Sequence, residues 1–187
     1  MAKLIEKDLE EAIVGLPNKE KNKILIRLIN KDKILVEQLH FRLLEHPEID
    51  LKLRQDAVAE EIEKIKKYAS FKSKELLSHE RLYFSQINHH KRITSDKVGE
   101  IRLGVKLILK LTNTYSAVFN KPDLKHNLKL NEFNIKKMLL LIKNLKAIHE
   151  DYRIEFVDDI NEILCFFYEG IHADLAKGLG LPRNIDY

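Results

Sequence analysis

Two Glu-x-x-His sequences could supply ligands to a metal ion. They are Glu37 with His40 and Glu169 with His172, and a pair at this spacing is half of what a di-iron helix bundle uses. Both side chains would have to project into the bundle core, but a helical wheel places Glu37 and Glu169 far from the apolar stripes of their helices. We therefore expect both carboxylates to face water, and we predict no metal site and no cofactor.

Two carboxylate pairs have the spacing that a Mg²⁺ site on helices would need. Glu60 with Glu63 and Glu155 with Asp158 are each three residues apart, so each pair shares one face of a helix. Carboxylate oxygens suit Mg²⁺, but acidic pairs are also common on exposed helices. A Mg²⁺-dependent hydrolase is therefore the weakest of three functional hypotheses.

Other catalytic signatures are missing from the sequence. It contains no Gly-x-x-x-x-Gly-Lys-Ser/Thr loop, no Gly-x-Gly-x-x-Gly turn and no His-Glu-x-x-His pair. The single cysteine, Cys165, lies between Leu164 and Phe166, which favours a buried, inert thiol over a nucleophile. An enzyme is less favoured than a binding protein, and we assign no catalytic residue.

The charged residues are segregated along the chain. The net charge is +4 overall, with a balance of 0 in residues 1–70, +10 in residues 71–146 and −6 in residues 147–187. A basic segment is what a phosphate backbone attracts, through lysine and arginine contacts that release counterions. Nucleic-acid or other anion binding is thus one hypothesis, and its candidate residues are Lys91, Arg92, Lys97, Arg102, Lys106 and Lys110.

The same segregation has a simpler interpretation. The basic helices can pack beside the acidic C-terminal helix, so that each neutralises the other at surface ion pairs of small individual value. The sequence carries no recognised nucleic-acid-binding motif. The leading hypothesis is therefore a non-enzymatic interaction protein that holds a protein partner or self-associates, with nucleic acid as the alternative partner.

Composition favours helices to position these residues. The chain of 187 residues is 44% hydrophobic, with six glycines, four prolines and no tryptophan, which is typical of long helices. The lone cysteine forms no internal disulfide, and Glu6 and Asp8 rule out a signal sequence at the start. The longest apolar run, residues 138–142, is too short to span a bilayer. We expect a cytoplasmic protein that makes no membrane contact.

The segment 96–120 is the most informative stretch. Apolar residues recur every three or four positions along it, and a second apolar set lies on nearly the opposite side, so this helix is expected to be buried and central. Between these faces lie Arg102, Lys106 and Lys110, at positions i, i+4 and i+8. That strip is predicted to be the solvent window of the helix.

Shorter and longer helices flank this segment. Three short helices are expected in the first quarter, the second capped by Asn18 and the third by Asp32. After the loop at 120–131, an apolar seam at residues 135–156 predicts a long helix. The last helix is expected to start at a capping box, Asp159 with Glu162, and to run to about residue 175.

These patterns predict an all-α fold. We expect a single compact bundle of seven or eight helices, three short ones at the N-terminus and then four or five longer ones around the central helix at about 96–120. Residues 1–187 are expected to form one all-helical domain, with the loop 120–131 as the candidate sub-boundary.

Overall fold

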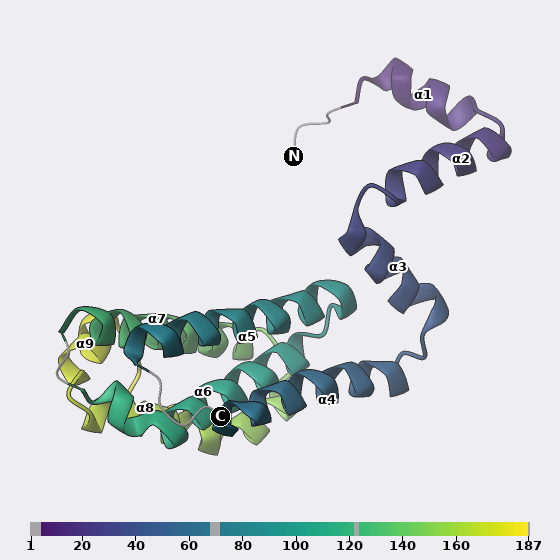
Figure 1. The fold of residues 1–187 in the computed structure, drawn as a ribbon. Helices are drawn as coiled ribbons and strands as arrows, with labels where there is room; N and C mark the ends of the chain where they lie inside the picture. Colours follow the sequence, from purple (N-terminus) through teal and green to yellow (C-terminus); the bar gives the residue numbers. More distant parts are fainter. Residues whose placement is uncertain (1–4, 68–71, 122–123, 187) are drawn as a thin grey trace. The chain divides into compact units, whose positions relative to one another are not determined.

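The structure is a computed structural model that describes residues 5–67, 72–121 and 124–186 (Figure 1). Within these ranges the regular secondary structure is entirely helical, which confirms the predicted all-α fold. The chain divides into two compact units, Met1–Glu45 and His46–Tyr187. The predicted loop 120–131 is too long, because a helix begins at Leu124, and the helices before and after the loop both belong to the second unit. The expectation of one domain over residues 1–187 stays a prediction.

The first unit consists of three short helices, as predicted. They are α1 (Lys7–Gly15), α2 (Asn18–Ile29) and α3 (Lys33–Leu44). The Asp32 carboxylate caps α3 by accepting hydrogen bonds from the backbone N–H groups of Ile34 and Leu35. The predicted cap of α2 is wrong, because Asn18 is the first helical residue and Pro17 occupies the N-cap position.

The second unit contains six α-helices and three short 3₁₀ helices among its described residues. They are α4 (Ile49–Glu63), η1 (Lys64–Lys67), α5 (Ser73–Thr94), α6 (Lys97–Phe119), α7 (Leu124–Leu145), η2 (Glu150–Tyr152), η3 (Ile154–Phe156), α8 (Val157–Glu169) and α9 (Ala173–Gly178). Pro122, the predicted hinge, lies outside the described residues. Long antiparallel helices form the body of this unit (Figure 1).

Helix α6 is the centre of the second unit, as its two apolar faces predicted. It contacts α4, α5, α7 and α8, and both predicted stripes are buried: Ile101, Val105, Ile108 and Tyr115 on one side, Leu103, Leu107 and Leu111 on the other. A helix that is apolar on two faces must be covered on both, and four neighbouring helices provide that cover.

The predicted helices after residue 131 needed three corrections. Helix α7 ends at Leu145 instead of following the seam to Phe156, and Tyr152 is exposed. Helix α8 begins at Val157, so Asp159 lies in its first turn and is not the N-cap. The last apolar stripe is divided by Gly170 into α8 and α9, which raises the number of α-helices in the described residues to nine.

The turn between α5 and α6 is built around the Asp96 carboxylate. Asp96 is the N-cap of α6, and its Oδ1 accepts a hydrogen bond from Gly99 N at 2.8 Å. Its Oδ2 lies 2.5 Å from Gln55 Nε2 of α4 and 3.2 Å from His90 Nε2 of α5. Ser95, in the left-handed conformation with φ 59°, reverses the chain before the cap. One carboxylate thus joins three helices.

A second polar contact is fully buried between α5 and α7. The Glu80 carboxylate has no exposed surface, and its Oε2 accepts a hydrogen bond from Asn134 Nδ2 at 2.9 Å. Glu80 Oε1 and Asn134 Oδ1 have no hydrogen-bond partner among the described residues. Burial raises the pKa of Glu80 to about 8, although Asn134, Lys137 and Arg81 act in the opposite direction. A protonated Glu80 would carry an O–H donor. Asn134, which already bonds Glu80 through Nδ2, has in Oδ1 an acceptor for which no described residue supplies a donor.

Gly99→Ala should destabilise the second unit by about 2 kcal/mol, because an added Cβ would lie 1.9 Å from Asp96 Oδ2 and 2.7 Å from Gln55 Nε2. Asp96 would have to leave its cap position, and its bond to Gln55 would be lost. Thermal unfolding followed by circular dichroism measures the effect. The matched control is Gly178→Ala in α9, where nothing lies within 4 Å of the added atom. Equal stability of the two variants would contradict this account of the turn.

Stability should fall as pH rises between about 4.5 and 8, because native Glu80 keeps its proton over this interval and the unfolded chain does not. The slope from this group is at most about 1.4 kcal/mol per pH unit. Glu80→Gln keeps a neutral side chain of the same shape, so the difference between wild type and variant isolates Glu80. We expect the two melting temperatures to diverge as pH rises, with the wild type losing more. Parallel melting curves across this range would show that Glu80 is ionised in the fold.

Candidate functional site

Most of the six candidate cations are already paired with carboxylates of the same chain. Arg102 Nη2 lies 2.8 Å from Glu155 Oε1, and Lys106 Nζ lies 3.2 Å from Glu63 Oε1. Lys110 forms an ion pair with the other oxygen of Glu63. The cationic strip on α6 therefore faces acidic side chains of α4 and of the 3₁₀ turn before α8.

The three remaining cations flank the turn between α5 and α6. Lys91 Nζ lies 2.5 Å from Oε2 of Glu100, a residue that is almost buried and also accepts a hydrogen bond from Asn144. Arg92 and Lys97 are exposed. At least four of the six candidates thus have a carboxylate partner, and nucleic-acid binding through them stays a prediction.

The ion pairs join residues from two competing hypotheses. Glu63 and Glu155 are candidate Mg²⁺ ligands, and they neutralise the candidate anion-binding strip instead. Hydrogen bonds from Lys110 and then Lys106 lower the pKa of Glu63. Since Glu63 is on the surface, water screens these pairs and each contributes little to stability. Their effect is to reduce the positive potential that the strip presents.

The four residues of the Glu-x-x-His pairs are dispersed. His40 Nδ1 contacts Glu45 Oε1 at 2.9 Å, and His172 Nε2 contacts Asn127 Oδ1. His172 is half-buried, and this burial lowers its pKa. Within the ranges that the structure describes, no three His, Cys, Asp or Glu side chains converge in a way that could hold a metal ion.

Two single residues differ from the sequence-based expectation. Cys165 is exposed, not buried, and a hydrogen bond with Glu169 raises the pKa of its thiol, so the thiolate is disfavoured. His149, which lies on the predicted 135–156 seam, is also exposed and accepts a hydrogen bond from Asp151 N at the start of η2. Both corrections follow from where the helices end and which faces are covered.

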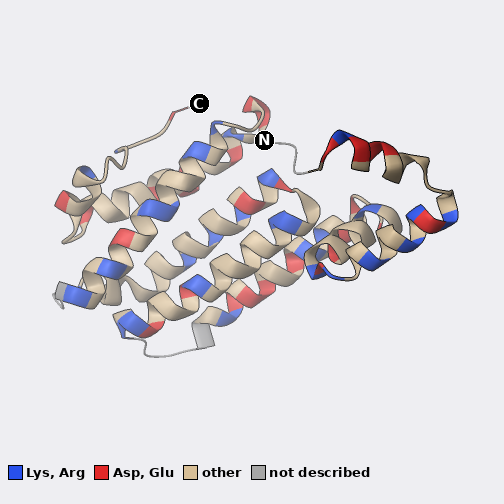
Figure 2. Cartoon of the chain, turned by 90° about the horizontal axis from the view of Figure 1, so that it is seen from above, with Lys and Arg blue, Asp and Glu red and all other residues tan. Residues whose placement is uncertain are grey.

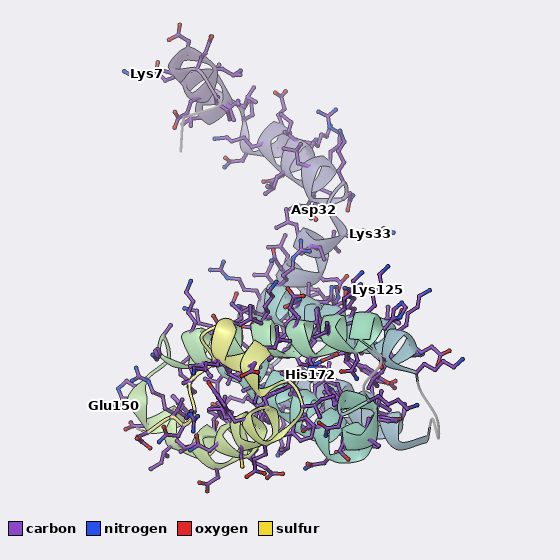
Figure 3. The ribbon with its side chains drawn as sticks, turned by 90° about the vertical axis from the view of Figure 1, so that its left-hand side faces the viewer. Lys7, Asp32, Lys33, Lys125, Glu150 and His172 are labelled. Atoms are coloured by element: carbon purple, nitrogen blue, oxygen red, sulfur yellow. The ribbon has the colours of Figure 1, made fainter. Side chains whose placement is uncertain are left out.

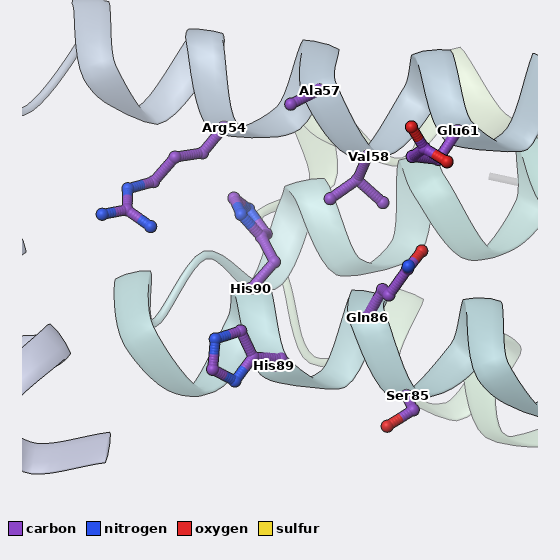
Figure 4. A pocket seen from close by; sticks show the side chains of 8 residues that line it. All are labelled: Arg54, Ala57, Val58, Glu61, Ser85, Gln86, His89 and His90. Carbon is purple, nitrogen blue, oxygen red and sulfur yellow. The ribbon is translucent and has the colours of Figure 1, made fainter. Parts of the chain in front are cut away.

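A cleft of about 550 Å³ lies between α4 and α5 (Figure 4), a size that suits a small molecule. Its lining residues are Arg54, Ala57, Val58 and Glu61 from α4, with Ser85, Gln86, His89 and His90 from α5. Arg54 and Glu61 lie toward opposite ends of the cleft, with Val58 between them (Figure 4). The cleft therefore offers one positive end, one negative end and an apolar wall.

The cleft adjoins the Asp96 carboxylate through His90. Burial alone would raise the pKa of Asp96, but hydrogen bonds from His90, Gly99 N–H and Gln55 together lower it, so Asp96 is a carboxylate that orients the imidazole. Ser85 points away from α4 (Figure 4) and does not form a nucleophile–base pair with His90. This arrangement can position a bound group but does not activate a hydroxyl.

Sequence reasoning overlooked a second set of cations on α7. Lys125, Lys129, Lys136 and Lys143 are exposed and lie within about 40° of one another on the helix; we call them the α7 lysine face. Lys125 projects from the surface in Figure 3, and basic residues recur along this part of the chain in Figure 2. Lys136 pairs with Glu132, whereas the other three have no carboxylate within 4 Å among the described residues. The lysines recur at the 3.6-residue period of a helix, and this spacing in the sequence could have identified the α7 lysine face.

The first unit has an unusual surface. None of its described side chains is buried, and many of its large apolar residues are exposed, among them Leu9 by 54%, Leu25 by 56% and Leu28 by 52%. Apolar residues recur along α1 and α2, but no described element of the first unit buries them. No described helix is long and apolar enough to cross a membrane.

Comparison of this chain with protein-family models, curated proteins and solved structures gives no match.

Polyanion binding should depend more on the α7 lysine face than on the α6 strip, because Glu63 competes for Lys106 and Lys110. We expect Lys125→Gln with Lys129→Gln to lower the salt concentration that elutes the chain from immobilised heparin. The matched control, Lys106→Gln with Lys110→Gln, removes the same charge and should lower it less. An equal or larger effect of the control would identify the α6 strip as the anion site.

Proposed function

We propose that this protein is a non-enzymatic helical interaction protein that binds a protein partner through its first unit. The supporting observation is the exposed apolar surface of residues 5–45, which we call the N-terminal arm. Its large exposed apolar residues are Ile5, Leu9, Ile13, Val14, Ile24, Leu25, Ile26, Leu28, Val36, Leu43 and Leu44. Contiguous apolar surface beyond a few hundred Å² marks an interaction site on a soluble protein.

The arm is too small and too open to be stabilised by a core of its own. Units of about 40 residues usually need disulfides, metals or association to fold stably. The arm contains no cysteine, and no metal-ligand cluster occurs among the described residues. Association is the remaining source of burial, and it would remove the apolar side chains from water at about 25 cal/mol per Å².

The apolar residues are arranged for helix packing. Leu9 and Ile13 lie on one face of α1, and Leu25 with Leu28 lie on one face of α2; we call these four residues the arm face. Residues spaced by three or four positions are the anchors of helix-in-groove recognition. The second unit, in contrast, has a buried apolar core around α6, although some of its large apolar residues are exposed too.

Nucleic-acid binding through the basic segment 71–146 is the second candidate function. It is supported by the α7 lysine face, three of whose four lysines have no carboxylate partner within the described residues. The phosphate backbone attracts such a row of cations without sequence preference. This candidate involves a surface of the second unit and is independent of the arm.

A photo-crosslinking residue placed at Leu28 should form adducts with a protein in native extract or in the purified chain, because the arm face contacts the partner. The same residue placed at Leu82, an exposed leucine of α5, is the matched control and should form none. Adding Leu25→Gln should reduce the Leu28 adduct severalfold by removing a neighbouring anchor. Equal labelling from both positions, or none from Leu28, would exclude the arm as a binding surface.

A further inference from the structure

We propose that the partner of the N-terminal arm is a second copy of this chain, joined in a two-fold dimer in which α1 of each copy packs on α2 of the other. This inference rests on the proposed interaction function and names its partner. Three observations carry it: the link between α1 and α2, the charges of the two helices, and the exposure of the arm face.

The link between α1 and α2 is extended, and neither helix covers the apolar face of the other within one chain. Leu16 and Pro17 have ψ of 148° and 144°, so two consecutive residues are extended, and the proline ring fixes φ. Lys21 Nζ donates a hydrogen bond to Val14 O at 2.8 Å, which occupies a C-terminal carbonyl of α1. The two helices therefore leave the link in different directions, and the apolar faces of both remain exposed.

Charge then selects which helices pair between copies. Helix α1 has one basic and three acidic residues, net −2, whereas α2 has four basic and one acidic, net +3. Pairing α1 with α1, or α2 with α2, would bring like charges together, whereas pairing α1 with α2 brings opposite charges together. A second copy carries both helices, so the chain is complementary to itself.

Two-fold symmetry uses this complementarity twice. In an isologous interface the contact of α1 with the partner's α2 is repeated as the contact of α2 with the partner's α1. Leu9 and Ile13 of one copy would then face Leu25 and Leu28 of the other, which gives each exposed stripe an apolar cover.

The test exchanges charges on one helix at a time. Asp8→Lys with Glu11→Lys makes both helices positive, and Lys23→Glu with Arg27→Glu makes both negative. Each double variant alone should dissociate to monomers, since α1 and the partner's α2 then repel each other. An equimolar mixture of the two variants should restore a dimer, because every contact between unlike chains joins opposite charges.

Sedimentation velocity over roughly a hundredfold range of protein concentration measures the association. We expect each charge variant to weaken dimerisation at least about tenfold, and raised salt to weaken the wild-type dimer. Lys125→Glu with Lys129→Glu on α7 is the matched control and should leave the dimer intact, and circular dichroism verifies that all variants keep the helices of the second unit.

The outcomes separate this inference from the proposed function. A wild-type dimer, its loss in both variants and its recovery in the mixture support the second copy as partner. A monomeric wild type whose Leu28 probe crosslinks to a different protein overturns the second copy and retains the interaction function. A monomeric chain without Leu28 adducts overturns both. A dimer that survives both charge exchanges overturns the pairing of α1 with α2.

Discussion

The Asp96 carboxylate is the contact on which the arrangement of the second unit depends. It accepts hydrogen bonds from Gly99 N–H at the start of α6, from Gln55 of α4 and from His90 of α5. These three bonds fix the direction in which α6 leaves the turn, and α6 then carries the largest set of buried residues in the described fold. Glycine at position 99 is required because any Cβ would occupy the space of the carboxylate. The hydrogen bonds of Asp96 at one end of the bundle thus determine how α6 lies in the apolar core.

Charge in this protein serves two different purposes. Within the second unit, the carboxylates of Glu63 and Glu155 lie against the cations of α6, so groups that could have bound a metal ion or a phosphate are used to pair helices. On the N-terminal arm, acidic α1 and basic α2 are not neutralised by packing on each other, and their apolar faces stay exposed. Surface charge that is satisfied internally contributes little to recognition, whereas charge beside uncovered apolar side chains supports specific association.

Periodicity was sufficient to predict the fold, because it depends only on neighbours along one helix. The two stripes of residues 96–120 predicted a buried α6, and Asp32 was recognised as the cap of α3. Contacts between distant residues were out of reach: Arg102 and Glu155 are 53 positions apart, and no spacing rule joins them. Periodicity also identifies which residues share a face but not whether another element covers it. For that reason Cys165 was expected to be buried although it is exposed, and the sequence did not reveal that large apolar residues of α1 and α2 are exposed.

The division of buried surface between the two units has a consequence for how the protein responds to its own abundance. The second unit buries its core within one chain, so its stability does not depend on protein concentration. In the proposed dimer the arm obtains its burial from association, so its folded population would follow the law of mass action. In dilute solution the arm is then expected to unfold as a separate cooperative unit. Its amide protons would exchange faster and it would be cleaved by proteases sooner, while the helices around α6 stay folded. A single chain would thereby combine a second unit that is folded at any concentration with an arm whose folded fraction rises with the local concentration of the protein.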